Sequence, residues 1–438
     1  MKKPFIFSLV AACAVMTVAR ADTPPIPDHT LDSMLSYAME HNFQIQQSQE
    51  QIREQEGLII ELKSSVLPNV GVNASYTLED ENLVVGGVAP GTGADKFWSV
   101  RLQVNQLVYS GGQVSATLRA QRLAEEAIVY ALKSTIEQVA YQVSFRFYDA
   151  LLARDQIQVE QENVNYLQEQ LKNVQDRFEA KTVSRFDVLQ AEVELANAQP
   201  ALIRAKNNYR IAIDELYSVI GHQNTDMLPY DGSEIEGELN FDPMPYDLAS
   251  ALTEAMQYRP EVLQLDTLIE AREAGIDIAK SGYYPTVSVY GNYGLEKNPR
   301  YDAFSESNEG WGVGIQSSWS IFDGRATRGK LIQARSQLRQ TQLDRQQLQL
   351  TIEVDVRRAV SALQEAEELA GAANKVVEQA KEALRLAEVR YEAGAATQLE
   401  LLQSRVALTE ARTNLLSANY SYLLAKAQYR RAVGAVSR

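Results

Sequence analysis

The residues that most often carry enzymatic or metal chemistry are scarce in this sequence of 438 residues, which has one cysteine and three histidines. The histidines, His29, His41 and His222, lack metal-ligand spacing, and no cysteine or histidine can complete a nucleophilic dyad. After the first 21 residues, no run approaches the ~18–20 apolar residues of a membrane-spanning helix. We therefore expect no enzymatic activity, no metal and no cofactor.

Positive charge is also in short supply. The chain has 42 basic and 57 acidic residues, so its formal net charge is −15. This balance argues against nucleic acid as a partner. An acidic surface ordinarily serves solubility, and it acquires a further role only if several copies line one channel.

The N-terminus has the pattern of a secretory signal peptide over residues 1–21. Two lysines open it, residues 5–18 are apolar, and Ala-Arg-Ala at 19–21 is a cleavage motif. Removing this segment takes away three basic residues and moves the charge from −15 to −18. The single cysteine, Cys13, lies inside it, so no disulfide is expected. An alternative is a lipobox, Val-Ala-Ala-Cys, which makes Cys13 a lipid anchor.

An internal duplication organises the rest of the chain. At an offset of 217 residues, Pro68 and Tyr76 meet the same residue types in the second half, and after a loop of different length the offset becomes 213. At that offset, Trp98 meets Trp311 and Gly221 meets Gly434. The two halves are therefore expected to be structural copies.

Each copy is expected to contain a helix, a strand pair, a very long helix, a tight turn and another helix. We expect a first repeat at 22–221 with strands at 70–110 and a hairpin tip at 178–187. A connector at 222–247, rich in proline, glycine and acid, follows it. The second repeat is expected at 248–434 with strands at 286–324 and a tip at 391–400, and a tail at 435–438.

The strand segments alternate apolar with small or polar residues, as at positions 70, 72, 74, 76 and 78. Four strands in two hairpins are too few to bury their own faces, so they need partners from other chains. Strands of this length are used by outer-membrane barrels. Aromatic residues of these segments are candidates for the bilayer interfaces: Tyr76, Trp98, Tyr109, Tyr290, Tyr293, Trp311, Trp319 and Phe322. The alternative for them is packing in a water-soluble sandwich.

The helical segments are unusually long. No proline interrupts residues 113–178 or 327–391, and each stretch of ~65 residues predicts a helix of ~100 Å. Apolar residues such as Val139, Val143 and Phe147 recur in steps that are typical of a coiled-coil seam. Pro200 falls inside a shorter helix and predicts a bend.

A common motif closes each long helix: an aromatic residue, Glu-Ala, a small turn, then an acid before a leucine-rich helix. It occupies residues 177–198 and 390–411. The duplicated order of strand pairs and hairpins, from about Leu31 to Gly434, resembles the TolC-like outer-membrane efflux protein family. A rival hypothesis is a soluble periplasmic coiled-coil adaptor, which the four amphipathic strands disfavour.

The resemblance implies a mainly α fold with a small β part in a homotrimer of the outer membrane. Long antiparallel coiled-coil helices would form a periplasmic α-barrel, and four strands per protomer would contribute to a twelve-stranded β-barrel. The implied function is a passive exit duct for an efflux or type I secretion system. Its implied partners are a periplasmic adaptor (membrane fusion) protein and an inner-membrane RND or ABC-type transporter.

The resemblance also implies a gate at the second hairpin tip. Tyr391 matches the family's tyrosine, Glu400 its first acid, and Asp187 the acid of the first hairpin that restrains the tyrosine. Gln403 stands where the family has a second acid, and Ala396 stands where it has a restraining arginine. The alternative for Asp187 and Glu400 is an ordinary acid at a helix N-terminus.

One phosphate-loop pattern, G-x-x-x-x-G-K, spans residues 324–330. Leu331 replaces the hydroxyl residue that would bind Mg²⁺, the preceding strand is half polar, and the duplicate at Gly111 lacks the pattern. We therefore expect no nucleotide site.

Overall fold

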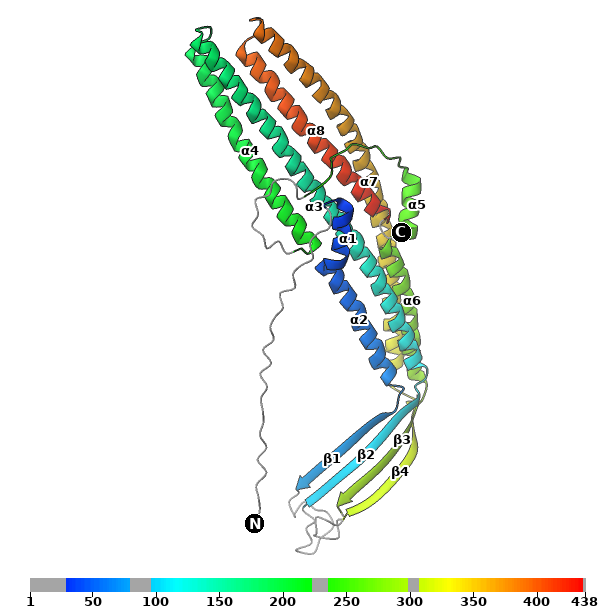
Figure 1. The fold of residues 1–438 in the computed structure, drawn as a ribbon. Helices are drawn as coiled ribbons and strands as arrows, with labels where there is room; N and C mark the ends of the chain where they lie inside the picture. Colours follow the sequence, from blue (N-terminus) through cyan, green and yellow to red (C-terminus); the bar gives the residue numbers. More distant parts are fainter. Residues whose placement is uncertain (1–28, 79–95, 223–234, 298–306, 436–438) are drawn as a thin grey trace, which may run out of the picture.

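The computed structural model describes residues 29–78, 96–222, 235–297 and 307–435. The molecule is elongated, with a four-stranded sheet at one end and two helical hairpins at the other (Figure 1). The elements of the first half are α1 (Leu31–His41), α2 (Phe43–Ser64), β1 (Asn69–Leu78), β2 (Lys96–Tyr109), α3 (Gln113–Glu179) and α4 (Arg185–Ile220). Those of the second half are α5 (Leu248–Tyr258), α6 (Pro260–Lys280), η1 (Ser281–Tyr283), β3 (Thr286–Lys297), β4 (Ser307–Ser318), α7 (Ala326–Glu392) and α8 (Gln398–Ala432).

The expected leader at 1–21, with Cys13, lies outside the described residues, as do residues 223–234 of the connector. Among the helices of the described ranges, none combines the length and the apolar composition needed to cross a membrane.

The two longest helices, α3 and α7, have 67 residues each, which corresponds to about 100 Å. Both follow a left-handed residue, Gly112 (φ +83°) or Arg325 (φ +73°), that turns the chain out of the sheet. α4 continues as one helix through Pro200.

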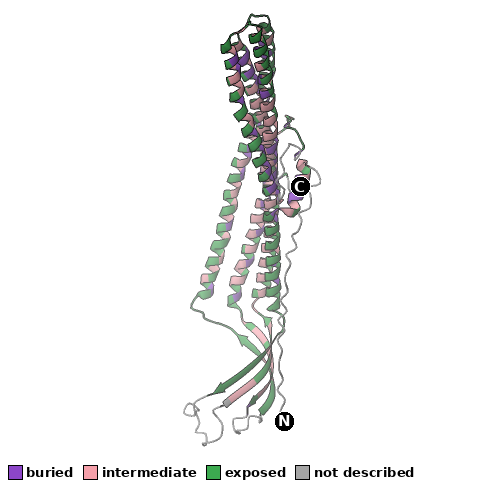
Figure 2. Cartoon of the chain, turned by 60° about the vertical axis from the view of Figure 1, so that its left-hand side comes forward, coloured by how far each residue is buried: buried purple, intermediate pink, exposed green. Residues whose placement is uncertain are grey.

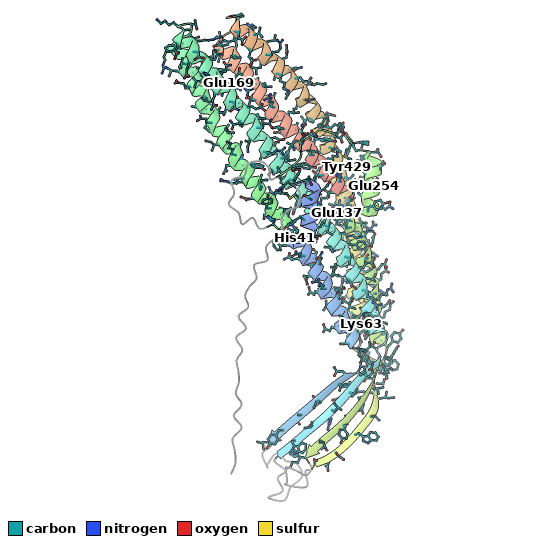
Figure 3. All side chains as sticks on the ribbon, viewed as in Figure 1. His41, Lys63, Glu137, Glu169, Glu254 and Tyr429 are labelled. Atoms are coloured by element: carbon teal, nitrogen blue, oxygen red, sulfur yellow. The ribbon has the colours of Figure 1, made fainter. Side chains whose placement is uncertain are left out.

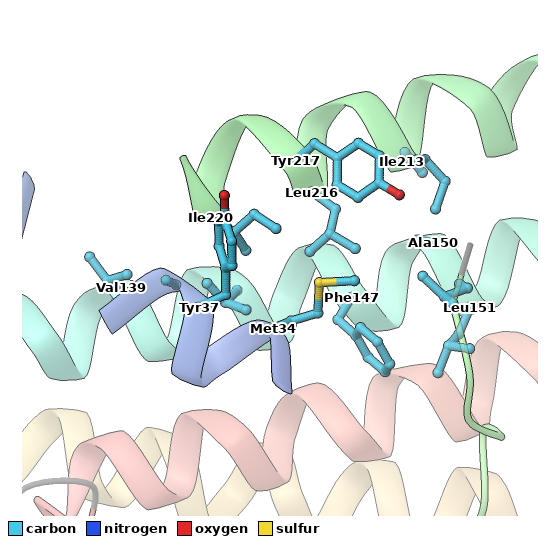
Figure 4. Packing of buried hydrophobic residues seen from close by; sticks show 14 of the residues in the cluster. Met34, Tyr37, Val139, Phe147, Ala150, Leu151, Ile213, Leu216, Tyr217 and Ile220 are labelled. Atoms are coloured by element: carbon cyan, nitrogen blue, oxygen red, sulfur yellow. The ribbon is translucent and has the colours of Figure 1, made fainter. Parts of the chain in front are cut away.

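The helices form one curved layer. Toward the tips, neighbouring contacts give the order α4, α3, α8, α7, and toward the sheet they give α2, α3, α6, α7 (Figure 1). The largest core cluster lies where the two sets meet. There, Met34 and Tyr37 of α1 pack against Phe147 of α3 and Leu216 of α4 (Figure 4).

Two equivalent joints connect the helices on the tip side of the molecule with those on the sheet side. At the first joint, α4 ends at Gly221 against the bend between α1 and α2, where Asn42 caps α2 and its amide donates to the carbonyl of Val219 at 2.6 Å. At the second joint, α8 is followed by Gly434, which lies against Arg259 between α5 and α6. His41 marks the first joint in Figure 3, while Glu169 lies near the tips.

The sheet is antiparallel with the order β1-β2-β3-β4. Its register aligns the apolar alternation of all four strands, so that Val72, Leu102, Tyr293 and Trp311 form one row across one face. Among the described residues, every buried apolar side chain lies outside the strands, and Figure 2 accordingly shows the sheet largely exposed. The sheet is thus held by backbone pairing, with both faces uncovered in the single chain.

Candidate functional site

The gate candidates lie at the end of the molecule opposite the sheet, where the first hairpin (α3 and α4) and the second hairpin (α7 and α8) turn (Figure 1). The two turns have the same backbone form. Thr182 N donates to Arg177 O at 2.9 Å, and Ala395 N donates to Arg390 O at 2.8 Å. The residues with positive φ, Lys181 and Gly394, are equivalent in the duplication.

Asp187 caps the helix to which it belongs. Its Oδ2 accepts from Ser184 N at 2.8 Å and from Ser184 Oγ at 2.7 Å, and Ser184 Oγ accepts from Asp187 N at 3.4 Å. This is a reciprocal capping box. The Oδ2 atom of the carboxylate is therefore engaged by Ser184.

Tyr391 crosses to the first hairpin through its ring. The guanidinium of Arg177 on α3 lies 4.9 Å from the centroid of the Tyr391 ring, which is a cation–π contact. A second tip contact joins Gln398 Nε2 to the carbonyl oxygen of Asp187 at 3.4 Å. Arg177 is not among the gate residues predicted from the sequence, although it opens the motif at 177–198 as Arg390 opens the duplicate motif at 390–411.

Glu400 lies in the first turn of α8, where its backbone N–H donates to Thr397 Oγ1 at 3.2 Å. Its carboxylate is 3.6 Å from Arg390 Nη2, and the two side chains are 46% and 60% exposed. A surface pair of this kind contributes little to stability. Gln403 is exposed about one turn further along α8. The structure thus gathers Asp187, Tyr391, Glu400 and Gln403 at one end of the molecule.

The strand aromatics divide between two faces. Tyr76 pairs with Trp98, and Tyr293 pairs with Trp311, all on the apolar face. Tyr109 joins that face after a register shift in β2.

Tyr290 is an exception among the aromatic candidates. It lies on the polar face between Asn105 and Gly314, where a Cβ at Gly314 would be 2.6 Å from its hydroxyl. It therefore lies on the opposite face of the sheet from Tyr293, because strand positions an odd number of residues apart point to opposite faces.

Trp319 and Phe322 follow β4 and are 58% and 84% exposed. The Trp319 Nε1–H donates to the carbonyl of Tyr283 at 3.1 Å. This bond ties the helix-proximal end of the sheet to the segment before β3.

The phosphate-loop pattern has a different role in the structure. Asp323 Oδ2 accepts from Thr327 N at 2.7 Å and so caps α7. Hydrogen bonds from Thr327 lower the pKa of Asp323, which keeps a negative charge where a phosphate would bind. Within the described ranges, no three potential ligand side chains gather closely enough to hold a metal ion.

Comparison with known proteins accounts for both halves of the chain. The family model described as "Outer membrane efflux protein" matches residues 34–222 and 251–435. The chain is 22% identical to outer membrane protein TolC of Vibrio cholerae over 380 residues, which are 86% of this chain and 84% of TolC. It is 21% identical to outer membrane efflux protein BepC of Brucella suis over 426 residues, 95% of this chain and 89% of BepC.

Solved structures share the fold. The CmeC outer membrane channel of Campylobacter jejuni matches with a TM-score of 0.77 at 15% sequence identity, over 98% of this chain and 94% of CmeC.

Proposed function

Because the chain belongs to the outer membrane efflux protein family, we propose a role for each of its three parts: the sheet crosses the outer membrane, the long helices enclose a periplasmic tunnel, and the hairpin tips form the gate. As a member of this family, the protein is an outer-membrane exit duct of an efflux or secretion system and extends into the periplasm. The family consists of channels rather than enzymes.

The observation that carries the proposal is the uncovered apolar face of the sheet. Val72 and Trp311, in one row of this face, are 67% and 76% exposed. The opposite face has polar or small residues such as Gln103, Asn292 and Gly312 in register. If copies of the sheet from three protomers close into a twelve-stranded barrel, the apolar face contacts lipid and the polar face contacts water inside the barrel.

The spacing of the aromatics supports the same orientation. On β2, Trp98 lies near the end remote from the helices and Tyr109 at the end next to them. Eleven residues separate them, which is ~37 Å along a strand and roughly 28 Å along the normal of a barrel whose strands tilt ~40°. This span is close to the thickness of an outer-membrane apolar band, so the two aromatics fit opposite bilayer interfaces.

Exposed apolar residues on the two edges of the helical layer support a ring of copies. α4 and α7 are these edges toward the tips, and each has an exposed apolar series within ~25 residues of its tip. The series are Phe186, Leu189, Val193, Ile203 and Ile211 on α4, and Leu369, Val376, Leu386 and Val389 on α7. Two different edges meeting head to tail make a heterologous interface that closes into a ring. Members of this family act as trimers, so we propose α4 of one copy against α7 of the next.

At the tips, we assign Glu400, Gln403, Tyr391 and Asp187 to the constriction. Three-fold symmetry would bring three Glu400 carboxylates together, where a divalent cation can bridge them. The ring of Tyr391 would restrain the second hairpin through Arg177, and the capping role of Asp187 would hold the first tip in shape. The tips would face a periplasmic adaptor and, through it, an inner-membrane RND or ABC-type transporter.

The channel role is tested by purification and by conductance in planar bilayers. We expect a detergent-dependent, heat-modifiable trimer that conducts ions. A monodisperse monomer that needs no detergent would instead favour a soluble periplasmic scaffold.

The gate assignment is tested by divalent block of single channels. Glu400→Gln should lose most of the block, while the matched control Glu410→Gln, an exposed glutamate further along α8, should keep it. Tyr391→Leu should raise resting conductance, whereas Tyr391→Phe should not, because the ring rather than the hydroxyl contacts Arg177. Equal divalent block in both glutamate variants would show that Glu400 is an ordinary charge at a helix end and not part of the gate.

A further inference from the structure

The contacts within a hairpin differ in character from those between hairpins. Within the second hairpin, Leu384 and Ala387 of α7 pack on Leu401 and Leu408 of α8 as a buried apolar cluster. Toward the tips, α3 and α8 meet largely through polar side chains, although Leu402 adds an apolar contact to the first hairpin. Further from the tips, Leu416, Tyr420 and Leu423 of α8 pack against the largest core cluster. Polar pairs along this α3–α8 seam include Gln156 with Thr413, Asn163 with Thr409, and Glu162 with Arg412.

Arg405 of α8 is the buried centre of this seam, with a relative exposure of 7%. Its Nε donates to Asn163 Oδ1 on α3 at 3.2 Å, and the same oxygen accepts from Thr409 Oγ1 at 3.4 Å. The guanidinium carbon lies 4.5 Å from the centroid of the Tyr166 ring, also on α3. A buried guanidinium is costly unless its surroundings supply partners, and here these come from the opposite hairpin.

Acidic groups complete the surroundings of Arg405. Burial and the nearby Arg412 lower the pKa of Arg405, while Tyr166, Glu162 and Glu388 act in the opposite direction. Burial, and then the carboxylate of Glu388 on α7, raise the pKa of Tyr166. Buried Arg405 and half-buried Tyr166 thus lie where α3 and α8 meet, and acidic groups of α3 (Glu162) and α7 (Glu388) act on them.

We propose that Arg405 is a positioning residue that latches the second hairpin against the first and so sets the closed state of the channel. This inference rests on the proposed gate at the tips. The tip pair of Glu400 and Arg390 lies within the second hairpin and is exposed, so it cannot hold the hairpins together. Arg405 joins the hairpins from a buried position.

The polar character of the seam makes such a latch reversible. When the hairpins part, Arg405 exchanges Asn163 and the Tyr166 ring for water, which solvates a guanidinium well. Separation of an apolar seam of the same size would expose hydrophobic surface and would be opposed accordingly. The hairpins can thus part as units while their internal apolar contacts remain.

The test is the open probability of single channels formed by the full-length trimer. Arg405→Met keeps an unbranched side chain of similar length and removes the charge, so we expect a rise of about tenfold, equivalent to about 1.4 kcal/mol. Arg405→Lys should give a smaller rise, since it keeps the charge but loses the planar fork. The matched control is Arg385→Met, because Arg385 pairs with Glu382 of its own helix at 2.7 Å and should leave opening unchanged.

Salt separates the latch from a surface effect. The difference between Arg405→Met and the unaltered protein should persist from ~0.1 M to ~1 M KCl, because buried charges are screened little. If Arg405→Met opens no more often than the unaltered protein while Tyr391→Leu still raises conductance, the latch is refuted and the gate stands. If the channel conducts but no variant at the tips or at Arg405 changes opening or block, the proposed gate itself fails.

A second experiment tests the latch even if the Arg405→Met protein does not assemble. Asn163→Cys combined with Thr409→Cys places one thiol on each side of the seam. A short bis-methanethiosulfonate reagent, which forms a disulfide with each thiol and releases methanesulfinate, should hold the channel closed, and reduction of the disulfides should restore opening. Unchanged opening after verified cross-linking would overturn the proposal.

Discussion

Single glycines allow the chain to form the two joints between the helical sets. Gly221 has φ +81°, and a Cβ there would lie 2.4 Å from the carbonyl oxygen of His41. Its duplicate, Gly434, has φ +70° and lies against the backbone of Arg259. In both joints, a left-handed residue without a side chain lets one helix end directly against the bend between two others.

We predict that Gly221→Ala destabilises the protein by more than ~1–2 kcal/mol, because it combines a left-handed alanine with a collision against fixed backbone. The matched control is Gly371→Ala in the middle of α7, where nothing lies within 4 Å of the new Cβ. This control should stabilise by roughly 0.5–1 kcal/mol. Apparent melting temperatures of the trimers measure both, and a Gly221→Ala protein that melts no earlier would contradict the role of the joint.

A histidine at the first joint should make stability depend on pH. His222 Nδ1 is 3.2 Å from the Tyr37 hydroxyl, and Tyr37 stacks on His41 with ring centroids 4.0 Å apart. Burial, and then His41, lower the pKa of His222 below its ordinary 6.5. Between the lowered pKa and pH 6.5, His222 binds more protons in the unfolded chain than in the folded one. The contribution of neutral His222 to the free energy of unfolding is therefore complete above pH 6.5, and it is lost as the pH falls through the lowered pKa.

We therefore predict that the apparent melting temperature falls between about pH 7.5 and about pH 5.5, and that His222→Gln reduces this fall. The comparison uses the difference between the two proteins, since carboxylates elsewhere titrate in both. Identical pH profiles would show that His222 does not contribute.

At the scale of elements, the register of the sheet determines which residues share a face. Val72 and Asn73 are neighbours in β1, but Val72 aligns with Leu102 on the apolar face and Asn73 with Arg101 on the polar face. A shift of one residue would reverse both faces.

We predict that Val72→Arg impairs assembly by roughly 2–4 kcal/mol if the site lies near the bilayer midplane, while Asn73→Arg is tolerated. The amount of folded trimer in outer membranes measures this. Equal assembly of the two variants would contradict the orientation of the sheet.

At the scale of the whole molecule, charge should govern what the open channel conducts. Without residues 1–21, each chain has a formal charge of −18, so three chains have −54. An enclosed acidic tunnel concentrates cations and excludes anions. We therefore expect the whole assembly to act as a cation filter, even though most of the individual acids lie on ordinary helix surfaces.

We predict a cation-selective pore whose selectivity weakens between ~0.1 M and ~1 M salt, as the Debye length falls from ~10 Å to ~3 Å. Reversal potentials in asymmetric KCl measure the preference. Anion selectivity at low salt would refute an acidic tunnel.

The amino-acid sequence alone was sufficient to predict the duplication, the α3 and α7 helices and the faces of the strands. These features depend on short periods and on residues that start or stop an element, such as Gly112 before α3 and Ser184 before α4. The alternation of its neighbours also implies the polar-face position of Tyr290, although the candidates for the bilayer interface group it with the apolar-face aromatics.

Only the tertiary structure decided which distant side chains meet at the tips. Asp187 binds Ser184 three residues away, and Tyr391 contacts Arg177. Arg405 meets Tyr166 of another hairpin. A helical period determines which residues share a face, but the rotation and axial position of one helix against the next depend on packing along its whole length. The gate contacts depend on both, so they could not be predicted from the sequence pattern.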